Sequence, residues 1–299
     1  MDTKPVNNRL PPWLTVRLPR PNTVNLVEKM MRDSRLHTVC ESARCPNLPE
    51  CWSKKTATFM ILGDVCTRNC GFCAIKTGKP LAVDAQEPQR VAEIAKEMEL
   101  KHIVVTSVNR DDLPDEGSGQ FAATIRALQQ TIPNAIVEVL TPDFKCKAWC
   151  VRRVVEAHPD IYNHNIETVD RLSPIVRPQA KYQRTLQMLQ MVKQMDPSVY
   201  TKSGIMVGLG ETRDEILKTM EDLRSHNVDA LTLGQYLRPT RRHLPVMEYV
   251  HPDTFAEYQE IGEKMGFLFV AAGPFVRSSY NAIEFSKRIL AERLEKVGA

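Results

Sequence analysis

The sequence predicts an α/β protein built on a partial (β/α)6 TIM-like barrel with N-terminal and C-terminal extensions, and three observations carry this prediction. From residue 57 onward, short apolar runs rich in β-branched residues alternate with stretches that have apolar residues at helical spacing. The 299 residues are 42% hydrophobic and 25% charged, which is typical of a folded globular chain. The alternating region has six or seven βα units in about 215 residues, short of the roughly 250 of a closed eight-stranded barrel.

Three regions follow from this pattern: an N-terminal extension over 1–56, the partial barrel over 57–273 and a C-terminal extension over 274–299. A doubly wound open sheet is the alternative α/β architecture. The sequence favours the barrel, because no Gly-x-Gly-x-x-Gly turn follows the first predicted strand and the loop there carries cysteines instead.

The N-terminal extension begins with a proline-rich stretch. Residues 1–22 hold five of the 20 prolines, which resist helix formation and predict an extended arm. A helix capped by Thr23 is predicted next, because apolar residues recur at helical spacing from Leu26 to Met31. Residues 37–56 contain three cysteines and two prolines, and we expect an irregular loop that binds a ligand.

Seven strands and five helices are predicted in the barrel region. The strands are short and apolar, and the last is the least regular: 58–62, 102–108, 136–140, 161–166, 202–207, 230–233 and 267–271. Each helix is predicted from the apolar residues along one face: Val91, Ile94 and Met98; Phe121, Ile125, Leu128 and Ile132; Leu186, Leu189 and Met195; Ile216, Met220 and Leu223; Phe255, Tyr258, Ile261 and Met265. Thr212 and Glu215 precede the fourth helix with the spacing of a capping box.

Composition excludes several classes of protein. Forty Lys and Arg against 36 Asp and Glu give a net charge of +4, far from the strongly basic surface of a nucleic-acid-binding protein. No run approaches the ~18 apolar residues of a membrane span, and the opening residues lack the apolar core of a signal peptide. We therefore expect a cytoplasmic protein with no nucleic-acid or membrane partner, and nothing in the sequence requires more than a monomer.

The positive charge is concentrated in residues 1–56, which hold ten Lys and Arg against five Asp and Glu. A solvated extension is one interpretation of this excess. The other is a docking surface for an acidic partner or electron donor, with Lys54 and Lys55 among its charges.

Eight cysteines in a chain expected to be cytosolic indicate metal binding or catalysis rather than disulfides. Cys66, Cys70 and Cys73 follow the first predicted strand with the spacing Cys-x3-Cys-x2-Cys. A [4Fe-4S] cluster takes four ligands, so three thiolates leave one iron open to a small molecule. A structural zinc site is the alternative, but it normally has four protein ligands and no fourth is obvious here.

With Phe72 as the aromatic residue before its third cysteine, this loop resembles the signature of the radical S-adenosylmethionine (SAM) enzymes. In that superfamily the loop also follows the first strand of a partial barrel. The resemblance implies that SAM chelates the open iron through its amino and carboxylate groups. It further implies that one electron from the cluster cleaves SAM to a 5′-deoxyadenosyl radical, a species that only a cofactor can supply.

Cys40, Cys45 and Cys51 form a second triplet, Cys-x4-Cys-x5-Cys, and residues 277–280 read RSSY. Together with the first loop, these motifs resemble lipoyl synthases over nearly the whole chain. The resemblance implies an auxiliary [4Fe-4S] cluster, a second cluster in all, bound by this triplet and by Ser279. Serine oxygen is a harder ligand than thiolate, so its bond to iron should be the easiest to release. Buried inert cysteines and a helix N-cap at the serines are the alternatives.

The activity implied by the resemblance is sulfur insertion at C6 and C8 of a protein-bound octanoyl-lysine, which forms the lipoyl cofactor. Two radicals remove hydrogen in turn, and each carbon radical attacks a sulfide of the auxiliary cluster, which is the sulfur donor. Cys66, Cys70, Cys73 and Ser279 are thus the expected catalytic residues. The implied partners are an octanoylated lipoyl carrier domain or the glycine-cleavage H protein, and a flavodoxin- or ferredoxin-type electron donor.

Candidate SAM contacts follow several predicted strands, because barrel active sites gather at the C-terminal ends of strands. The candidates are aromatic, polar or lie in a glycine motif: Phe72, Thr106, Ser107, Asn165, Glu167, Arg177 and Gly208. Arg177 suits the methionine carboxylate, because a guanidinium binds a carboxylate through two hydrogen bonds. Gly208 lies in a stretch that resembles the superfamily's Gly-x-Ile-x-Gly-x-x-Glu sequence along the adenine, with Met206 in place of isoleucine. Simple turns, at Asp111 and Asp112 for example, are the alternative.

Two cysteines remain outside both triplets. Cys146 and Cys150 are four residues apart around Trp149 and are expected to share a helix face as packing thiols. Two alternatives for the whole chain also remain. One is a sulfur-inserting radical SAM enzyme of the biotin synthase or methylthiotransferase kind, which lacks RSSY, and the other is a non-catalytic zinc or iron–sulfur module.

Overall fold

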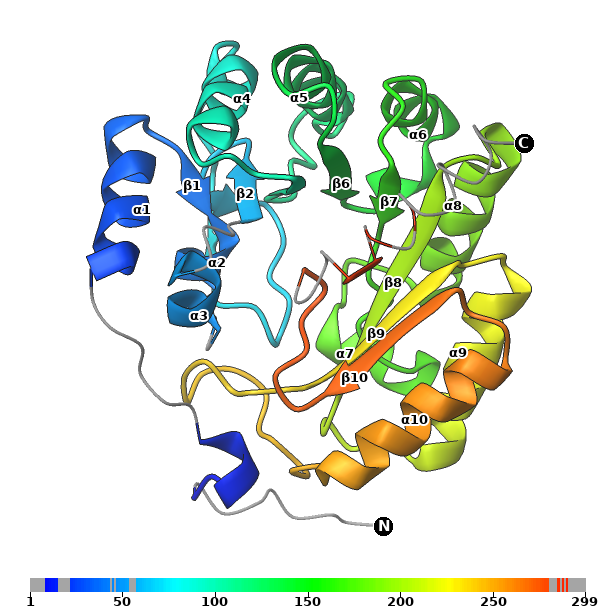
Figure 1. The fold of residues 1–299 in the computed structure, drawn as a ribbon. Coiled ribbons are helices and arrows are strands. Elements are labelled where there is room, and N and C mark those ends of the chain that lie inside the picture. The colour runs from blue at the N-terminus through cyan, green and yellow to red at the C-terminus, as the bar shows by residue number, and fades with distance from the viewer. Residues whose placement is uncertain are drawn as a thin grey trace.

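The central sheet of the computed structural model is a curved, open barrel (Figure 1). The structure describes residues 9–15, 22–43, 45, 47–53, 58–279, 284, 285, 287 and 289. The sheet runs in the order β1 (His37–Thr38), β2 (Thr58–Ile61), β5 (His102–Ser107), β6 (Ile136–Leu140), β7 (Ile161–Asn163), β8 (Tyr200–Val207), β9 (Ala230–Gln235) and β10 (Phe269–Gly273). The seven strands from β2 to β10 are parallel, and β1 pairs antiparallel with β2.

Helices cover the outer, convex face of this sheet (Figure 1). One helix follows each parallel strand except the last: α4 (Glu87–Glu97), α5 (Ser118–Thr131), α6 (Ala148–Val155), α8 (Tyr182–Met195), α9 (Arg213–Ser225) and α10 (Pro252–Lys264). Shorter elements lie in the loops: β3 (Val65–Cys66), β4 (Lys76–Thr77), η2 (Phe144–Cys146), η3 (Asp170–Leu172) and α7 (Ser173–Val176). The described chain thus has six βα units followed by a seventh strand, which confirms the predicted partial barrel. The boundaries predicted for the two extensions stay predictions.

The N-terminal extension is more helical than expected. Its elements are η1 (Pro12–Leu14), α1 (Asn22–Asp33), β1, α2 (Val39–Ser42) and α3 (Leu48–Ser53). Thr23 lies inside α1 rather than capping it, because the helix already begins at Asn22. The described part of residues 37–53 contains a short strand and two helices, where an irregular loop was expected. The Thr38 hydroxyl starts α2 by accepting a hydrogen bond from the Glu41 amide. Lys54 and Lys55 lie outside the described residues.

The prediction that Cys146 and Cys150 share a helix face was wrong. Phe144, Lys145 and Cys146 have φ of 43°, 48° and 57°, a left-handed turn that ends before α6 begins. The turn sends the two thiols to different neighbours. Cys146 Sγ lies 3.3 Å from the carbonyl oxygen of Arg184, and Cys150 Sγ lies 3.4 Å from that of Asp115.

The amino end of the barrel is filled by apolar side chains. Ile136, Ile161, Ala230 and Phe269, each the first residue of its strand, form one buried cluster. Two residues of the C-terminal extension complete it, because Phe285 stacks on Phe269 with ring centroids 5.2 Å apart and Ile289 is 1% exposed. The C-terminal extension therefore closes this end, and the opposite end remains for a functional site. No helix in the described residues is both long and apolar enough to cross a membrane.

Farther along the strands, the barrel interior holds a buried ionic network. Lys202 Nζ lies 2.9 and 3.1 Å from the two carboxylate oxygens of Glu138, which also accept from Asn163 at 2.8 Å and lie 3.1 Å from His102 Nε2. Burial opposes ionisation of Glu138, but the attraction of Lys202 and the contacts with His102 outweigh it and lower the pKa of Glu138 to about 2. The Glu138 carboxylate is therefore ionised at neutral pH, beside the buried Lys202 ammonium group.

Replacing Glu138 by Leu should destabilise the chain, because Lys202 would remain buried without a counter-charge. We expect the free energy of unfolding to fall by about 3–5 kcal/mol in urea titrations followed by circular dichroism. The double variant E138L/K202M should recover most of this loss, because neither charge is left unpaired. Glu260→Leu, at an exposed pair with Lys264, is the matched control and should change little. A double variant as unstable as E138L would contradict this account.

Candidate active site

A cavity of about 520 Å³ lies at the carboxyl ends of the barrel strands. It is lined by both cysteine regions and by the RSSY sequence, through Cys40, Cys45, Cys66, Cys70, Cys73, Ser278 and Ser279. The predicted SAM contacts Phe72, Thr106, Ser107, Asn165, Glu167 and Arg177 line it too. Residues from three distant parts of the sequence therefore meet in one space, as expected for the active end of a barrel.

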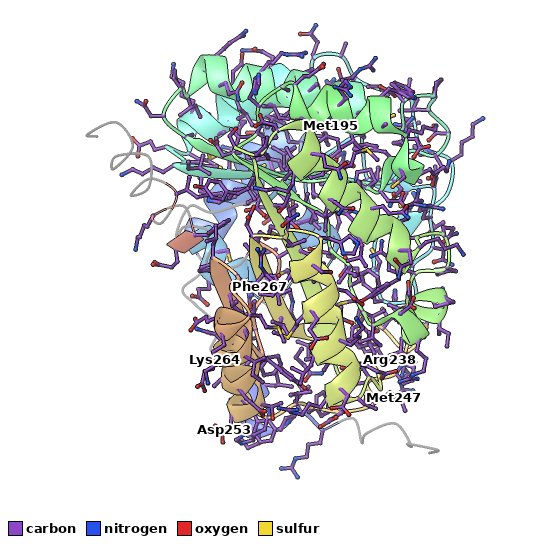
Figure 2. All side chains as sticks on the ribbon, turned by 90° about the vertical axis from the view of Figure 1, so that its right-hand side faces the viewer. Met195, Arg238, Met247, Asp253, Lys264 and Phe267 are labelled. Carbon is purple, nitrogen blue, oxygen red and sulfur yellow. The ribbon has the colours of Figure 1, made fainter. Side chains whose placement is uncertain are left out.

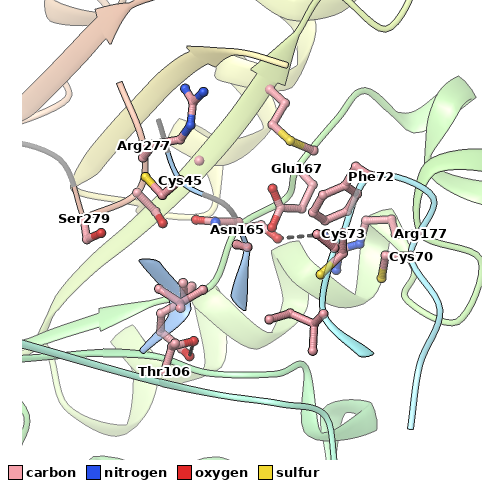
Figure 3. Close-up of a pocket in the computed structure, with 18 of the residues that line it drawn as sticks. Cys45, Cys70, Phe72, Cys73, Thr106, Asn165, Glu167, Arg177, Arg277 and Ser279 are labelled. Atoms are coloured by element: carbon pink, nitrogen blue, oxygen red, sulfur yellow. Dashed lines mark hydrogen bonds between the residues drawn. The ribbon is translucent and has the colours of Figure 1, made fainter. Parts of the chain in front are cut away.

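The cysteines occupy opposite sides of this cavity. Figure 3 shows Cys70 and Cys73 on one side, beside Phe72 and Arg177. Cys45, Arg277 and Ser279 lie on the other side, and Asn165 lies between the two groups (Figure 3). The arrangement separates two groups of candidate ligands.

The loop that carries Cys66, Cys70 and Cys73 is fixed by a buried arginine between the first two cysteines. Arg68 Nε and Nη2 donate to the Asp111 carboxylate at 2.8 and 2.7 Å, and Nη2 also lies 2.8 Å from Asp143 Oδ1. The Arg68 side chain is only 4% exposed, so its buried charge depends on these two carboxylates for compensation. Two carboxylates that follow neighbouring strands therefore hold the loop against the barrel.

The environment of the loop thiols fits metal binding. Cys66 Sγ accepts hydrogen bonds from the backbone amides of Arg68 and Asn109 at 3.4 and 3.3 Å, which fix the position of the sulfur atom. Burial raises the pKa of Cys70 to about 12 and that of Cys73 to about 11, and the neighbouring thiols add to both shifts. These thiols stay protonated at neutral pH unless a cationic metal centre compensates the charge of their thiolates.

The number of thiols on the cysteine loop bears on which metal centre it could bind. In the part of the chain that the structure describes, no three His, Cys, Asp or Glu side chains converge closely enough to bind one ion. A structural zinc ion needs four ligands around one point. The irons of a [4Fe-4S] cluster each take a different ligand, so the ligands lie farther apart. Three thiols on one loop at the cavity wall therefore fit a cluster better than zinc.

The other side of the cavity joins the two extensions. Thr58, the first residue of β2, donates from its hydroxyl to Ser279 Oγ at 3.0 Å. Asn47 Nδ2 donates to the carbonyl oxygen of Phe275 at 2.6 Å. Together these bonds hold the second cysteine region beside the RSSY sequence. The N-cap alternative for the serines concerns residues 280–283, which lie outside the described residues.

Arg177 lines the cavity but is already extensively bonded. Its Nη1 donates to the carbonyl oxygens of Asn165 and Ile166 at 2.6 and 2.8 Å, and its Nη2 donates to Thr185 Oγ1 at 3.2 Å and contacts His164 Nε2 at 3.4 Å. Burial and the charge of Arg177 lower the pKa of His164 to about 4, so this imidazole is neutral. Its Nδ1 lies 2.7 Å from the Thr141 carbonyl oxygen, which can only accept, and Nε2 is thus free to accept from Arg177.

Several buried polar atoms at the cavity have unused hydrogen-bonding capacity among the described residues. Ser107 Oγ, Asn109 Oδ1 and Asn165 Oδ1 are buried and have no hydrogen-bond partner in the described structure. Burial also raises the pKa of Glu167, and Arg177 opposes that shift without cancelling it. A ligand with amino, carboxylate and hydroxyl groups, such as SAM, would satisfy these atoms, because buried polar groups are rarely left unpaired.

Two predicted site residues do not line the cavity. Cys51 lies in α3 and packs beside the apolar core of the first barrel half. Gly208 follows β8 with φ of 99°, and a Cβ there would lie 2.4 Å from the Glu248 carbonyl oxygen, so glycine is required for packing. The alternative interpretation of Asp111 and Asp112 was that they only form turns. In the structure their side chains form ion pairs, Asp111 with Arg68 and Asp112 with Arg110.

Sequence reasoning missed four residues of the site: Arg68, Asp143, His164 and Thr58. Arg68 offered a signal, because a charged residue between two predicted cluster ligands must itself find a partner. Asp143 lies just after the predicted strand 136–140, at the end where barrel active sites gather, whereas His164 fell inside the predicted strand 161–166 and follows the shorter observed strand β7. Thr58 gave no signal, because a threonine at the start of an apolar strand is ordinary.

Removing the buried guanidinium should loosen the cysteine loop. Arg68→Gln leaves Asp111 and Asp143 without their cation, and Arg68→Lys cannot bridge both carboxylates with a planar fork. We expect iron to be lost to a chelator about 10-fold to 100-fold faster from R68Q under anaerobic conditions, the range typical of outer-shell partners. R68K should be intermediate. Arg171→Gln removes an exposed pair with Glu215 and should retain iron as the wild type does. Equal retention by all variants would show that Arg68 does not hold the loop.

The comparisons with known proteins agree with this arrangement. Residues 60–223 match the radical SAM superfamily, and residues 2–45 match the N-terminal domain of lipoyl synthase of the radical SAM family. The chain is 58% identical to the lipoyl synthase of Rubrobacter xylanophilus over 274 residues, covering 92% of this chain and 85% of that protein. It is 55% identical to that of Shouchella clausii over 284 residues, covering 95% and 92%.

Solved structures support the fold at low sequence identity. Methylornithine synthase (PylB) matches with a TM-score of 0.53 and 11% identity, covering 74% of each chain. The [FeFe]-hydrogenase maturase HydG matches with a TM-score of 0.57 and 14% identity, covering 83% of this chain and 56% of its own. Radical SAM enzymes use a [4Fe-4S] cluster and SAM. On the extent of its identity to curated relatives, the chain belongs to the lipoyl synthase family of radical SAM enzymes.

Proposed function

We propose that this enzyme inserts sulfur at C6 and C8 of a protein-bound octanoyl-lysine, with an auxiliary [4Fe-4S] cluster as the sulfur donor. The observation that carries the proposal is the single cavity, which is lined on one side by Cys66, Cys70 and Cys73 and on the other by Cys45 and Ser279. When bound there, the two clusters and SAM supply the radical and the sulfur, which side chains cannot supply.

The residues of each side have distinct roles in this proposal. Cys66, Cys70 and Cys73 bind one cluster and leave one iron for SAM. Cys40, Cys45, Cys51 and Ser279 bind the auxiliary cluster. The Ser279 oxygen is its weakest ligand, so the cluster can open without the loss of a thiolate. Thr58 holds the Ser279 hydroxyl toward the cavity through their 3.0 Å hydrogen bond.

The cavity wall between the two sides suits an acyl chain. Several of its lining side chains are apolar: Val39, Met60, Leu140, Ile205, Met206 and Val276. An eight-carbon chain would be bound there by burial of its apolar surface, and the same side chains would exclude water from a reactive carbon. The unpaired polar atoms of Ser107, Asn109 and Asn165 would bind the polar groups of SAM, with Arg177 and Glu167 near its methionine end.

The proposal extends to the partners. An octanoylated lipoyl carrier domain or the glycine-cleavage H protein would present the substrate lysine at the mouth of the cavity. A flavodoxin- or ferredoxin-type protein would supply electrons. All of these reactions would take place in the cytoplasm.

The direct test is incubation of the reduced, iron-loaded enzyme with SAM and an octanoyl-lysyl peptide. We expect cleaved SAM and a peptide that has gained two sulfur atoms as a dithiolane, detected by mass spectrometry. Iron and sulfide analysis should give on the order of eight irons per chain for two clusters. Cleaved SAM with no sulfur in the peptide would contradict the proposed sulfur insertion and leave a radical SAM enzyme with another substrate.

The role of Ser279 is tested by Ser279→Cys. A thiolate binds iron more firmly than serine oxygen, so the variant should retain its iron while the dithiolane yield falls by about tenfold or more. SAM cleavage should continue, because the other cluster is unchanged. Ser278→Cys is the matched control and should form product at the wild-type level. Full dithiolane yield from S279C would show that release of the Ser279 oxygen is not required.

A further inference from the structure

The loop after β9 carries a concentrated positive charge. Residues 238–243, here called the arginine loop, read Arg-Pro-Thr-Arg-Arg-His and contain no acidic residue. Arg238, Arg241 and Arg242 are all exposed. In Figure 1 this segment lies in the long gold connection between β9 and α10. Figure 2 shows Arg238 at the same end of the molecule as Met247 and Asp253, the end at which α10 begins.

The arginine loop is bonded directly to the loop that carries Cys66, Cys70 and Cys73. His243 Nε2 lies 3.0 Å from the Cys73 carbonyl oxygen, and the Leu244 amide donates to the Gly71 carbonyl oxygen at 3.0 Å. The approach is close, because a Cβ on Gly71 would lie 2.9 Å from Leu244 Cδ1. The arginine loop thus joins the protein surface to the backbone of the cysteine loop.

The arginine loop is also held in shape by its own hydrogen bonds. Arg238 Nε donates to the His243 carbonyl oxygen at 2.8 Å, and the Thr240 hydroxyl lies 2.8 Å from His243 Nδ1. The Tyr236 hydroxyl closes the base of the loop by donating to the Leu244 carbonyl oxygen at 2.8 Å. A surface that is already ordered loses little entropy when a partner binds.

Two of the charges have no acidic partner among the residues that the structure describes. Within the described residues, Arg241 and Arg242 form no ion pair with an acidic side chain, and the next acidic residue along the chain is Glu248. Arg68 and Arg171, by contrast, each pair with a carboxylate. Exposed, uncompensated charge of one sign attracts an oppositely charged protein and accelerates its association.

We propose that the arginine loop is the docking surface for the electron donor, an acidic protein that carries one electron at a time. The inference rests on the proposed function, because a radical SAM cluster at Cys66, Cys70 and Cys73 must be reduced from outside. In this step the donor loses one electron and the bound cluster gains it, with no bond made or broken and no proton transferred.

The position of the loop favours an electron donor over the substrate carrier. Electron transfer slows steeply with distance, so a donor must dock where the surface comes closest to the cluster. The arginine loop meets this need, because it contacts the backbone of Gly71 and Cys73. A carrier has no such requirement, since its flexible lysyl arm spans the distance to the cavity. The docking role expected of residues 1–56 stays a separate prediction.

The test compares R241E/R242E with the wild-type enzyme. The dissociation constant for oxidised flavodoxin is measured at low ionic strength by titration calorimetry, and SAM cleavage is measured with reduced flavodoxin and with dithionite. We expect binding to weaken by about tenfold or more and flavodoxin-driven cleavage to slow with it, because like charges now face each other. Cleavage driven by dithionite should be unchanged. For the wild type, binding should weaken as salt is added.

The matched control is R126E/R152E, which reverses two exposed arginines on α5 and α6. It should bind flavodoxin as the wild type does, and equal melting temperatures should show that both double variants are folded. Unchanged flavodoxin binding by R241E/R242E would overturn the proposal. Weaker binding of an octanoylated H protein alone would also overturn it and assign the loop to the carrier. Failure of the wild type to cleave SAM even with dithionite would refute the proposed function instead, while the binding result would still stand.

Discussion

An open parallel barrel has to be closed by segments outside its own strands, and this constraint organises the whole molecule. A closed barrel fills its interior with side chains from eight strands, but here the order of the described strands ends at β1 and β10. Phe285 and Ile289 of the C-terminal extension fill the amino end. The extensions also meet at the carboxyl end, where Asn47 bonds Phe275, and the barrel strand β2 bonds the C-terminal extension there through Thr58 and Ser279. The same segments that complete the fold therefore bring the second group of candidate ligands into the cavity.

The buried ion pairs of the barrel hold loops and strands in place. Glu138 and Lys202 compensate each other inside the barrel, and Arg68 is shared by Asp111 and Asp143 at its carboxyl end. Each set is well hydrogen-bonded, and a buried ion pair is tolerated only under this condition. Arg177 belongs to the same pattern, because backbone carbonyls and His164 fix its guanidinium at the cavity wall. The cavity therefore combines fixed walls with a few polar atoms still to be satisfied by a ligand.

The arginine loop combines packing against the cysteine loop with an exposed positive charge. Its backbone and His243 support the cysteine loop from outside, whereas Arg241 and Arg242 face solvent. The net charge of the chain gives no hint of this surface, because acidic residues elsewhere balance it. Surface charge acts locally, within roughly 10 Å at physiological salt, so the position of the arginines matters more than the total.

Much of the architecture could be predicted from the sequence, because it is encoded in local patterns. Six of the seven strands were clear from apolar, β-branched runs, and the capping box at Thr212 and Glu215 formed as expected. Cysteine spacing identified the two candidate ligand groups, since spacing is a property of the chain itself. The helices at 39–42 and 48–53 and the left-handed turn before α6 were missed, because short segments take their form from their tertiary contacts.

By itself, the sequence determined the fold class and the family, and it named the candidate side chains for the chemistry. Only the tertiary structure decided which partners those side chains have. The residues that pair in the site lie far apart along the chain: Arg68 and Asp143, Thr58 and Ser279, and His243 and Cys73. Local periodicity carries no information about such pairs, because it reports which face of an element is buried and not what covers that face. They form only when the curved sheet brings the carboxyl ends of its strands together.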